Sequence, residues 1–276
     1  MGASATGSTG QKRFLWHAVS LAIILFAAFF LFYKHIFSSG MLMHVDMTFP
    51  TTVDRNLILY NHTWWQYGSV QNIWNLQRAF WAYPLLGAAR LFHFSVETYL
   101  LILFVGTFAL AGASMYALCF DTVTRVFKDE KINLFARHAG CIFAGLVFMY
   151  NPFSVSHLWP YFGYPGYATL PLAFLLLTRA FRSPRTWIIV LLAIVLTVAG
   201  TSPINVIWYW FMIAAFAVFH LVSRHFDRES LVTAVKVLFS TAALFVVLNF
   251  AWIFPYAEAQ VARKPFNPSY ATIFSR

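Results

Sequence analysis

Charged residues are scarce in this sequence. Only 10% of its 276 residues are Asp, Glu, Lys or Arg, while 60% are hydrophobic and 20% are aromatic. Soluble domains carry about 25% charged residues. The composition therefore excludes an ordinary soluble domain and predicts an integral membrane protein built from apolar helices.

Several features of soluble enzymes and nucleic-acid-binding proteins are also missing. The two cysteines, Cys119 and Cys141, make neither a disulfide framework nor a zinc pattern, so we expect buried thiols. The sequence has no glycine-rich phosphate loop and no nucleophile elbow. The net charge of +10 is scattered through short connections and forms no basic stripe, so nucleic acid is not an expected partner.

Acidic residues are absent from the middle of every long apolar run. All nine lie in connections or near the ends of the runs. Proton-coupled pumps and many ion transporters place Asp or Glu in mid-membrane, and secondary transporters carry internal repeats that are not evident here. We therefore expect any chemistry at a membrane face. Two polar residues within the apolar runs are expected to have other roles. Asn249 is expected to join helices, and His17 is expected to lie at the interface.

Seven apolar runs are candidates for membrane-spanning helices of an all-α bundle, and a span needs about 20 mainly apolar residues. The first, second, sixth and seventh runs are long enough alone. The third, fourth and fifth need flanking residues or surrounding helices, and a hairpin is the alternative for the third and fourth. The runs are Leu15–Phe37, Thr98–Phe120, Ala139–Phe153, Pro165–Leu177, Trp187–Ala199, Pro203–Val222 and Leu231–Pro255.

The distribution of Lys and Arg predicts that the N-terminus is cytoplasmic. With that orientation, the short outer connections Ser154–Tyr164 and Gly200–Ser202 hold no basic residue, as the positive-inside rule requires. We expect residues 1–13 to be a disordered cytoplasmic tail and residues 14–258 to be a transmembrane module of the plasma membrane. The cytoplasmic stretches hold Lys12, Arg13, Arg125, Lys128, Lys131, Arg137, Arg179, Arg182, Arg185, Arg224 and Arg228.

The connection over residues 38–97 is long, and long ordered loops are usually functional. Its stretch Asn72–Phe92 has apolar residues at helical spacing, which predicts an amphipathic helix lying on the outer leaflet. Tryptophans of this loop would anchor it among the headgroups. The loop is therefore expected to fold against the outer face of the membrane.

Asp46 is the principal candidate for chemistry in this loop. A carboxylate partly enclosed by apolar chain could act as a general base or bind a divalent cation, with His44 as a possible second ligand. The alternative is a solvated aspartate that caps a turn. The neighbouring pair Asp54 and Arg55 could hold a phosphate or form a simple surface ion pair.

This arrangement resembles the GT-C class of membrane glycosyltransferases, especially its arabinofuranosyltransferase-like members. The features that carry the resemblance are Asp46 soon after the first span, the flat helix Asn72–Phe92, the segment Met149–Phe153 that ends a span, and the aromatic loop His157–Tyr167. Members of this class have a cytoplasmic N-terminus, an acidic residue early in a long first outer loop, and about seven spans in their shared part.

The resemblance implies a cell-envelope enzyme that moves a sugar from a polyprenyl-phosphate donor to a glycan or lipid acceptor on the outer face. Asp46 would be the catalytic base, with His44 as a ligand of a divalent metal. The implied substrate-binding residues are Asp54, Arg55, His157, Tyr161, Arg263 and Lys264.

The chain also departs from the family pattern. Family members usually continue into a large external region, whereas residues 259–276 are expected to form only an external tail here. A fragment of a longer protein and one subunit of an assembly are both consistent with this difference. The alternative function is a non-catalytic membrane subunit, a lipid-carrier translocase or an assembly scaffold with a partner membrane chain.

Overall fold

The computed structural model describes residues 6–36, 84–128, 133–152, 164–200 and 203–261 of the chain. Within these ranges the ordered structure is helical and contains no strand. Residues 84–91 are also helical. The remaining helices are α1 (Thr6–Leu31), α2 (Tyr33–Ile36), α5 (Val96–Val126), α6 (Leu134–Tyr150), α8 (Tyr164–Arg182), α9 (Thr186–Ala199), α10 (Pro203–Ser223) and α11 (Arg228–Val261).

Four helices are long and apolar enough to cross a membrane, through their segments Gln11–Leu31, Val96–Val126, Asn205–Ser223 and Arg228–Phe254. The helices α6 and α9 are apolar but shorter. The prediction of a helical protein embedded in a membrane is therefore supported.

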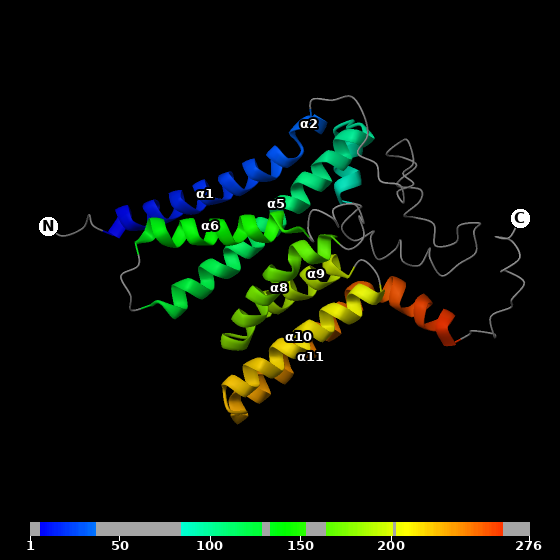
Figure 1. The fold of residues 1–276 in the computed structure, drawn as a ribbon. Helices are drawn as coiled ribbons and strands as arrows, with labels where there is room; N and C mark the ends of the chain where they lie inside the picture. Colours follow the sequence, from blue (N-terminus) through cyan, green and yellow to red (C-terminus); the bar gives the residue numbers. More distant parts are fainter. Residues whose placement is uncertain (1–5, 37–83, 129–132, 153–163, 201–202, 262–276) are drawn as a thin grey trace, which may run out of the picture.

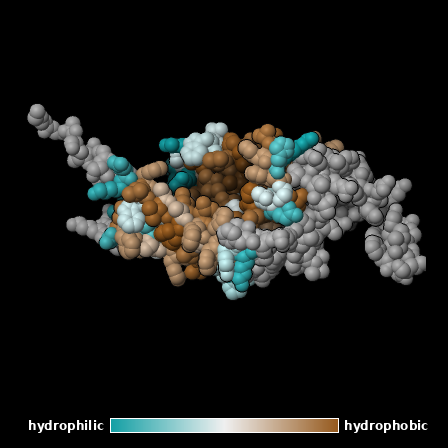
Figure 2. Space-filling model, turned by 90° about the horizontal axis from the view of Figure 1, so that it is seen from above, coloured by the Kyte–Doolittle hydropathy of each residue, from teal (hydrophilic) through white to brown (hydrophobic). Residues whose placement is uncertain are grey.

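The outer faces of these helices carry large apolar side chains. Phe26 of α1 is 73% exposed, Phe211 of α10 is 64% exposed and Phe239 of α11 is 75% exposed. In Figure 2, hydrophobic residues cover the middle of the described surface and hydrophilic residues lie toward its margins. Continuous apolar surface of this kind needs a non-aqueous environment, and hydrocarbon provides it.

The helices form two packed groups joined by α8. Helix α1 contacts both α5 and α6, and α5 and α6 contact each other (Figure 1). Helix α8 packs against α5 on one side and α9 on the other, and α9 contacts α10 and α11. A hydrogen bond from the hydroxyl of Ser114 on α5 to the carbonyl of Ala168 on α8, at 2.6 Å, ties the groups together.

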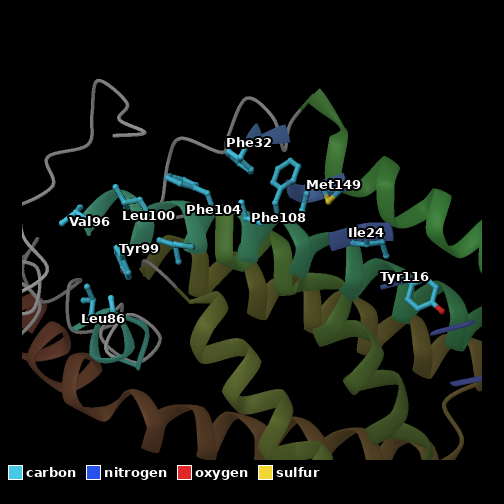
Figure 3. Close-up of a cluster of buried hydrophobic side chains, with 14 of the residues drawn as sticks. Ile24, Phe32, Leu86, Val96, Tyr99, Leu100, Phe104, Phe108, Tyr116 and Met149 are labelled. Atoms are coloured by element: carbon cyan, nitrogen blue, oxygen red, sulfur yellow. The ribbon is translucent and has the colours of Figure 1, made fainter. Parts of the chain in front are cut away.

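The first group has a buried apolar core that extends along α5. Figure 3 shows this core from Val96 at the start of the helix to Tyr116 in its second half, with Phe108 beside Met149 of α6. Two glycines allow the helices to approach closely, because a Cβ on Gly145 would lie 2.7 Å from the carbonyl oxygen of Gly112. Small residues at helix crossings are a common way to pack helices in membranes.

The second group has its own core of aliphatic and aromatic residues. Leu177 of α8, Leu192 of α9, Ile213 of α10 and Val237 of α11 are almost completely buried in it. The core lies on one face of each helix, so the opposite faces of α10 and α11 remain exposed. This division between a packed face and an outer apolar face is expected for helices at the edge of a membrane bundle.

Several helix boundaries differ from the predicted ones. Helix α1 begins at Thr6, inside the segment expected to be disordered, and α5 continues past Phe120 to Val126. The α5 extension is stabilised by Asp121, whose carboxylate pairs with Arg125 one turn later and with Arg179 of α8 at 3.0 Å. Hydropathy marks only the apolar part of a helix, whereas polar turns beyond it persist when their charges are paired.

Most of the described basic residues lie at one end of the bundle. The beginnings of α1, α6, α9 and α11 and the ends of α5, α8 and α10 all lie at the same end (Figure 1). The opposite end contains the end of α1 and the beginning of α5. The basic end carries Lys12, Arg13, Arg125, Arg137, Arg179, Arg182, Arg185, Arg224 and Arg228.

Candidate functional site

The site residues predicted from the sequence all lie outside the described residues. They are His44, Asp46, Asp54, Arg55, His157, Tyr161, Arg263 and Lys264. Their roles in catalysis, substrate binding and metal binding therefore stay predictions. Of the helix predicted over Asn72–Phe92, residues 84–91 are described and are helical. Leu86 and Ala89 of this helix are buried in the first core, so it packs against the bundle.

A cluster of polar side chains lies near the basic end of the first helical group. Tyr116 of α5 places its hydroxyl 2.8 Å from Nδ1 of His17 on α1 and 2.9 Å from Nδ1 of His138 on α6. The hydroxyl of Ser20 on α1 is 3.1 Å from Nδ1 of His138 and donates a hydrogen bond to the carbonyl of Trp16 at 2.7 Å. The imidazole of His138 on α6 therefore contacts polar groups from both α1 and α5.

Local structure explains how these side chains meet. His17 and Ser20 are three residues apart and lie on the same face of α1. His138 lies just beyond the first turn of α6, which begins where the side chain of Asn133 accepts a hydrogen bond from the N–H of Phe135 at 3.0 Å. Tyr116 approaches from the second half of α5.

Aromatic rings enclose His138. The indole of Trp16 stacks on its imidazole with a centroid distance of 5.8 Å, and Phe120 lies at 4.9 Å. The ring of His17 meets it edge-on, also at 4.9 Å. His138 is only 1% exposed, and its Nε2 atom has no hydrogen-bond partner among the described residues. A buried ring nitrogen without a partner is unusual and needs an explanation.

The two cysteines lie close to this cluster. Cys141 is buried one turn after His138, and Cys119 of α5 is half-buried; both are free thiols. The expectation of buried thiols is confirmed for Cys141 and only in part for Cys119. Within the described ranges, no three His, Cys, Asp or Glu side chains come together in a way that could hold a metal ion.

A second polar network joins α9 and α11. The amide of Asn249 donates to the hydroxyl of Thr197 and to the carbonyl of Phe245, both at 2.8 Å. Its oxygen accepts a hydrogen bond from the indole N–H of Trp252 at 2.8 Å. Asn249 is 2% exposed. The prediction that Asn249 joins helices is confirmed, and its enclosed position makes it a structural residue.

The Asn-Pro segment at the end of α6 also has a structural role. The ring of Tyr167 on α8 stacks on Phe148 with a centroid distance of 4.3 Å, and its hydroxyl donates to the carbonyl of Phe148 at 2.9 Å. The amide of Asn151 donates to the same carbonyl at 2.7 Å and contacts the Tyr167 hydroxyl. These contacts fix the start of α8 against the end of α6.

Comparisons with known proteins add no identification. No protein-family model, no curated protein sequence and no solved structure matches this chain.

Proposed function

We propose that this chain crosses the plasma membrane seven times with its N-terminus in the cytoplasm, and that it transfers a sugar on the outer face. The orientation is supported by the basic residues gathered at the bundle end where α1 begins (Figure 1). Positively charged residues in short connections are retained on the cytoplasmic side. The shorter helices α6, α8 and α9 bring the number of proposed spans to seven, and each of them packs between other helices.

The observation that carries the enzymatic proposal is where the described residues on either side of the long connection lie. Helix α2 before it and residues 84–91 after it both lie at the bundle end opposite the main group of basic residues (Figure 1). Asp46 belongs to this connection. In the proposed orientation the acid is therefore on the side where polyprenyl-phosphate sugars are used by enzymes of the resembling class.

The proposed reaction is a substitution at the anomeric carbon of the donor sugar. Asp46 removes the proton from an acceptor hydroxyl, whose oxygen then forms a bond to the anomeric carbon. The bond between that carbon and the phosphate oxygen breaks, and polyprenyl phosphate leaves. Arg55, Arg263 and Lys264 would hold the donor phosphate, with Asp54, His157 and Tyr161 contributing to substrate binding. His44 would hold or help to position a divalent cation.

The enzymatic proposal is tested by replacing the proposed base in the full-length chain in lipid nanodiscs. Asp46→Asn should reduce transfer from polyprenyl-phosphate sugars by at least about 100-fold, the usual contribution of a general base. Asp227→Asn, which alters an acid at the basic end, should leave transfer unchanged. Full activity of Asp46→Asn would rule out this mechanism. A wild-type chain inactive on every donor unless a partner chain is added would favour the non-catalytic subunit.

The orientation is tested separately by labelling single cysteines in a variant that lacks Cys119 and Cys141. A membrane-impermeant maleimide added to intact cells should label Leu91→Cys, because Leu91 is exposed near the start of α5. Ser183→Cys, between α8 and α9, should react only after the membrane is permeabilised. The reverse pattern would place the long connection in the cytoplasm and remove the basis for the transferase.

A further inference from the structure

The partnerless Nε2 atom of His138 lies in a network whose hydrogen atoms can be counted. Ser20 has one hydroxyl hydrogen, which it donates to the carbonyl of Trp16 at 2.7 Å. Its oxygen can then only accept at the 3.1 Å contact with Nδ1 of His138. That contact is a hydrogen bond only if Nδ1 of His138 carries a hydrogen.

The same assignment satisfies Tyr116. Its oxygen shares the single Nδ1 hydrogen of His138 with Ser20 in a three-centre hydrogen bond, at 2.9 Å and 3.1 Å. The hydrogen of Tyr116 is then free to be donated to Nδ1 of His17 at 2.8 Å. If Nδ1 of His138 carried no hydrogen, its lone pair would face a lone pair of the Ser20 oxygen. The hydrogen bonds therefore run from His138 through Tyr116 to His17, and Nε2 of His138 carries a lone pair.

This arrangement accommodates only one proton on His138. A second proton would sit on Nε2, where the described residues offer no acceptor and where Trp16 and Phe120 enclose the ring. An unpaired charge buried in such surroundings is strongly unfavourable. The network is therefore complete for the neutral imidazole and incomplete for the imidazolium.

Among the described residues, the ionisable groups around His138 give no compensation for that charge. The ionisable groups in and beside the cluster are His17 of α1, Tyr116 and Cys119 of α5, and Arg137 and Cys141 of α6. None is a carboxylate, and Arg137 is already positive. Protonation of His138 would therefore be favoured only after the ring leaves its site and reaches water, which separates α1 from α5 and α6.

We propose that His138, with Tyr116 and His17, forms a proton-sensitive lock that holds α1 against α5 and α6 at the basic end of the bundle. The lock is closed while His138 is neutral, and it opens with uptake of one proton. The proposal does not depend on the transferase reaction. In the proposed orientation, the lock responds to the pH of the cytoplasmic side.

The lock is tested by amide hydrogen exchange of the full chain in nanodiscs between pH 8 and pH 5. The exchange rates are corrected for the pH dependence of intrinsic amide exchange. The equilibrium for opening residues 13–24 of α1 should increase by up to about tenfold per pH unit as the pH falls, the limit for one proton. Helix α9, in the second core, should show no such increase. An opening equilibrium of α1 that does not change with pH would overturn the proposal.

Two variants separate the lock from other histidines. In His138→Asn the amide N–H takes the place of Nδ1–H and cannot be titrated, so α1 should remain closed and lose its pH response. His225→Asn changes an exposed histidine with φ of 53°, which asparagine tolerates, and should retain the response. A response that persists in His138→Asn, or that disappears in His225→Asn, would contradict the assignment.

A measurement on the unmodified protein covers the case in which His138→Asn does not fold. Ring-nitrogen NMR of chain labelled with ¹⁵N-histidine should show a neutral histidine with its hydrogen on Nδ1, the less common form of a free side chain. This signal should be lost as α1 opens. A signal for His138 with its hydrogen on Nε2 would overturn the network, whatever the behaviour of the variants.

Discussion

Gly112 and Gly145 determine how closely α5 and α6 can approach. A methyl group on Gly145 would lie 2.7 Å from the Gly112 carbonyl oxygen, which is backbone and cannot rotate away. We therefore expect Gly145→Ala to force the helices apart and to destabilise the protein by about 1–3 kcal/mol, the usual cost of overpacking. The shift in the unfolding midpoint during SDS titration of the micelle-bound protein measures this.

The same helix offers a matched control for that substitution. Gly140 also lies in α6, but a Cβ there would meet nothing within 4 Å. Gly140→Ala should be neutral or stabilise the protein by up to about 1 kcal/mol through the better helix propensity of alanine. Equal destabilisation by both substitutions would show that close packing at Gly145 is not the cause.

Single residues also show how far the sequence could predict the site. Asn249 is identifiable because a lone amide in an apolar run needs a partner on another helix, and it has one in Thr197. His17 is expected at the interface, and the sequence does not predict its bond to Tyr116, 99 positions further along the chain. No periodicity relates residues on different helices, so the packing of α1, α5 and α6 alone brings this cluster together.

Among the helices, α11 has a start that depends on pH. Asp227 precedes α11 and accepts a hydrogen bond from the N–H of Ser230 at 2.7 Å. Hydrogen bonds from Ser230 hold the pKa of Asp227 below its usual value. The ionised carboxylate therefore stabilises the folded state above the usual aspartate range, and this contribution is lost as the pH falls through the lowered pKa.

This behaviour predicts a pH-dependent effect of Asp227→Ala. The variant should unfold at lower SDS concentration than the wild type at pH 7, and the difference should shrink as the pH falls below about 4, near the ordinary pKa of aspartate. In Asp227→Asn a side-chain oxygen can still accept the hydrogen bond at every pH, so this variant should show a smaller difference. A difference that grows in acid would contradict the capping role.

Helix boundaries show why elements are predicted better than their ends. Every predicted apolar run has a corresponding helix, because runs of apolar residues cannot be accommodated otherwise in a bilayer. The ends differ where polar turns are stabilised by specific partners. Helix α5 extends to Val126 through the pairing of Asp121 with Arg179 on α8, and this contact depends on tertiary packing that the sequence of α5 alone does not contain.

At the scale of the whole molecule, the two helical groups have different relations to their surroundings. Helix α5 is central, and half of its most apolar segment is buried, whereas that proportion is 11% in α10 and 22% in α11. The long apolar helices at the edge therefore depend on lipid more than on protein for their environment. The sequence predicts that all are apolar, but it does not distinguish central helices from peripheral ones.

That dependence on lipid predicts a result that would be unusual for a soluble protein. Phe239 is 75% exposed near the middle of the apolar segment of α11, and Val232 is 59% exposed close to its basic end. On a water-facing surface, both Phe239→Lys and Val232→Lys would change stability by less than about 0.5 kcal/mol. In a bilayer, lysine at the centre of a helix costs about 2.5–3.5 kcal/mol, while a lysine near the end can extend its amine to the headgroups.

We therefore expect Phe239→Lys to reduce the amount of folded protein recovered in membranes several-fold and Val232→Lys to have little effect, as measured by fractionation and detergent extraction. Equal recovery of the two variants would mean that the exposed face of α11 is covered by something other than lipid.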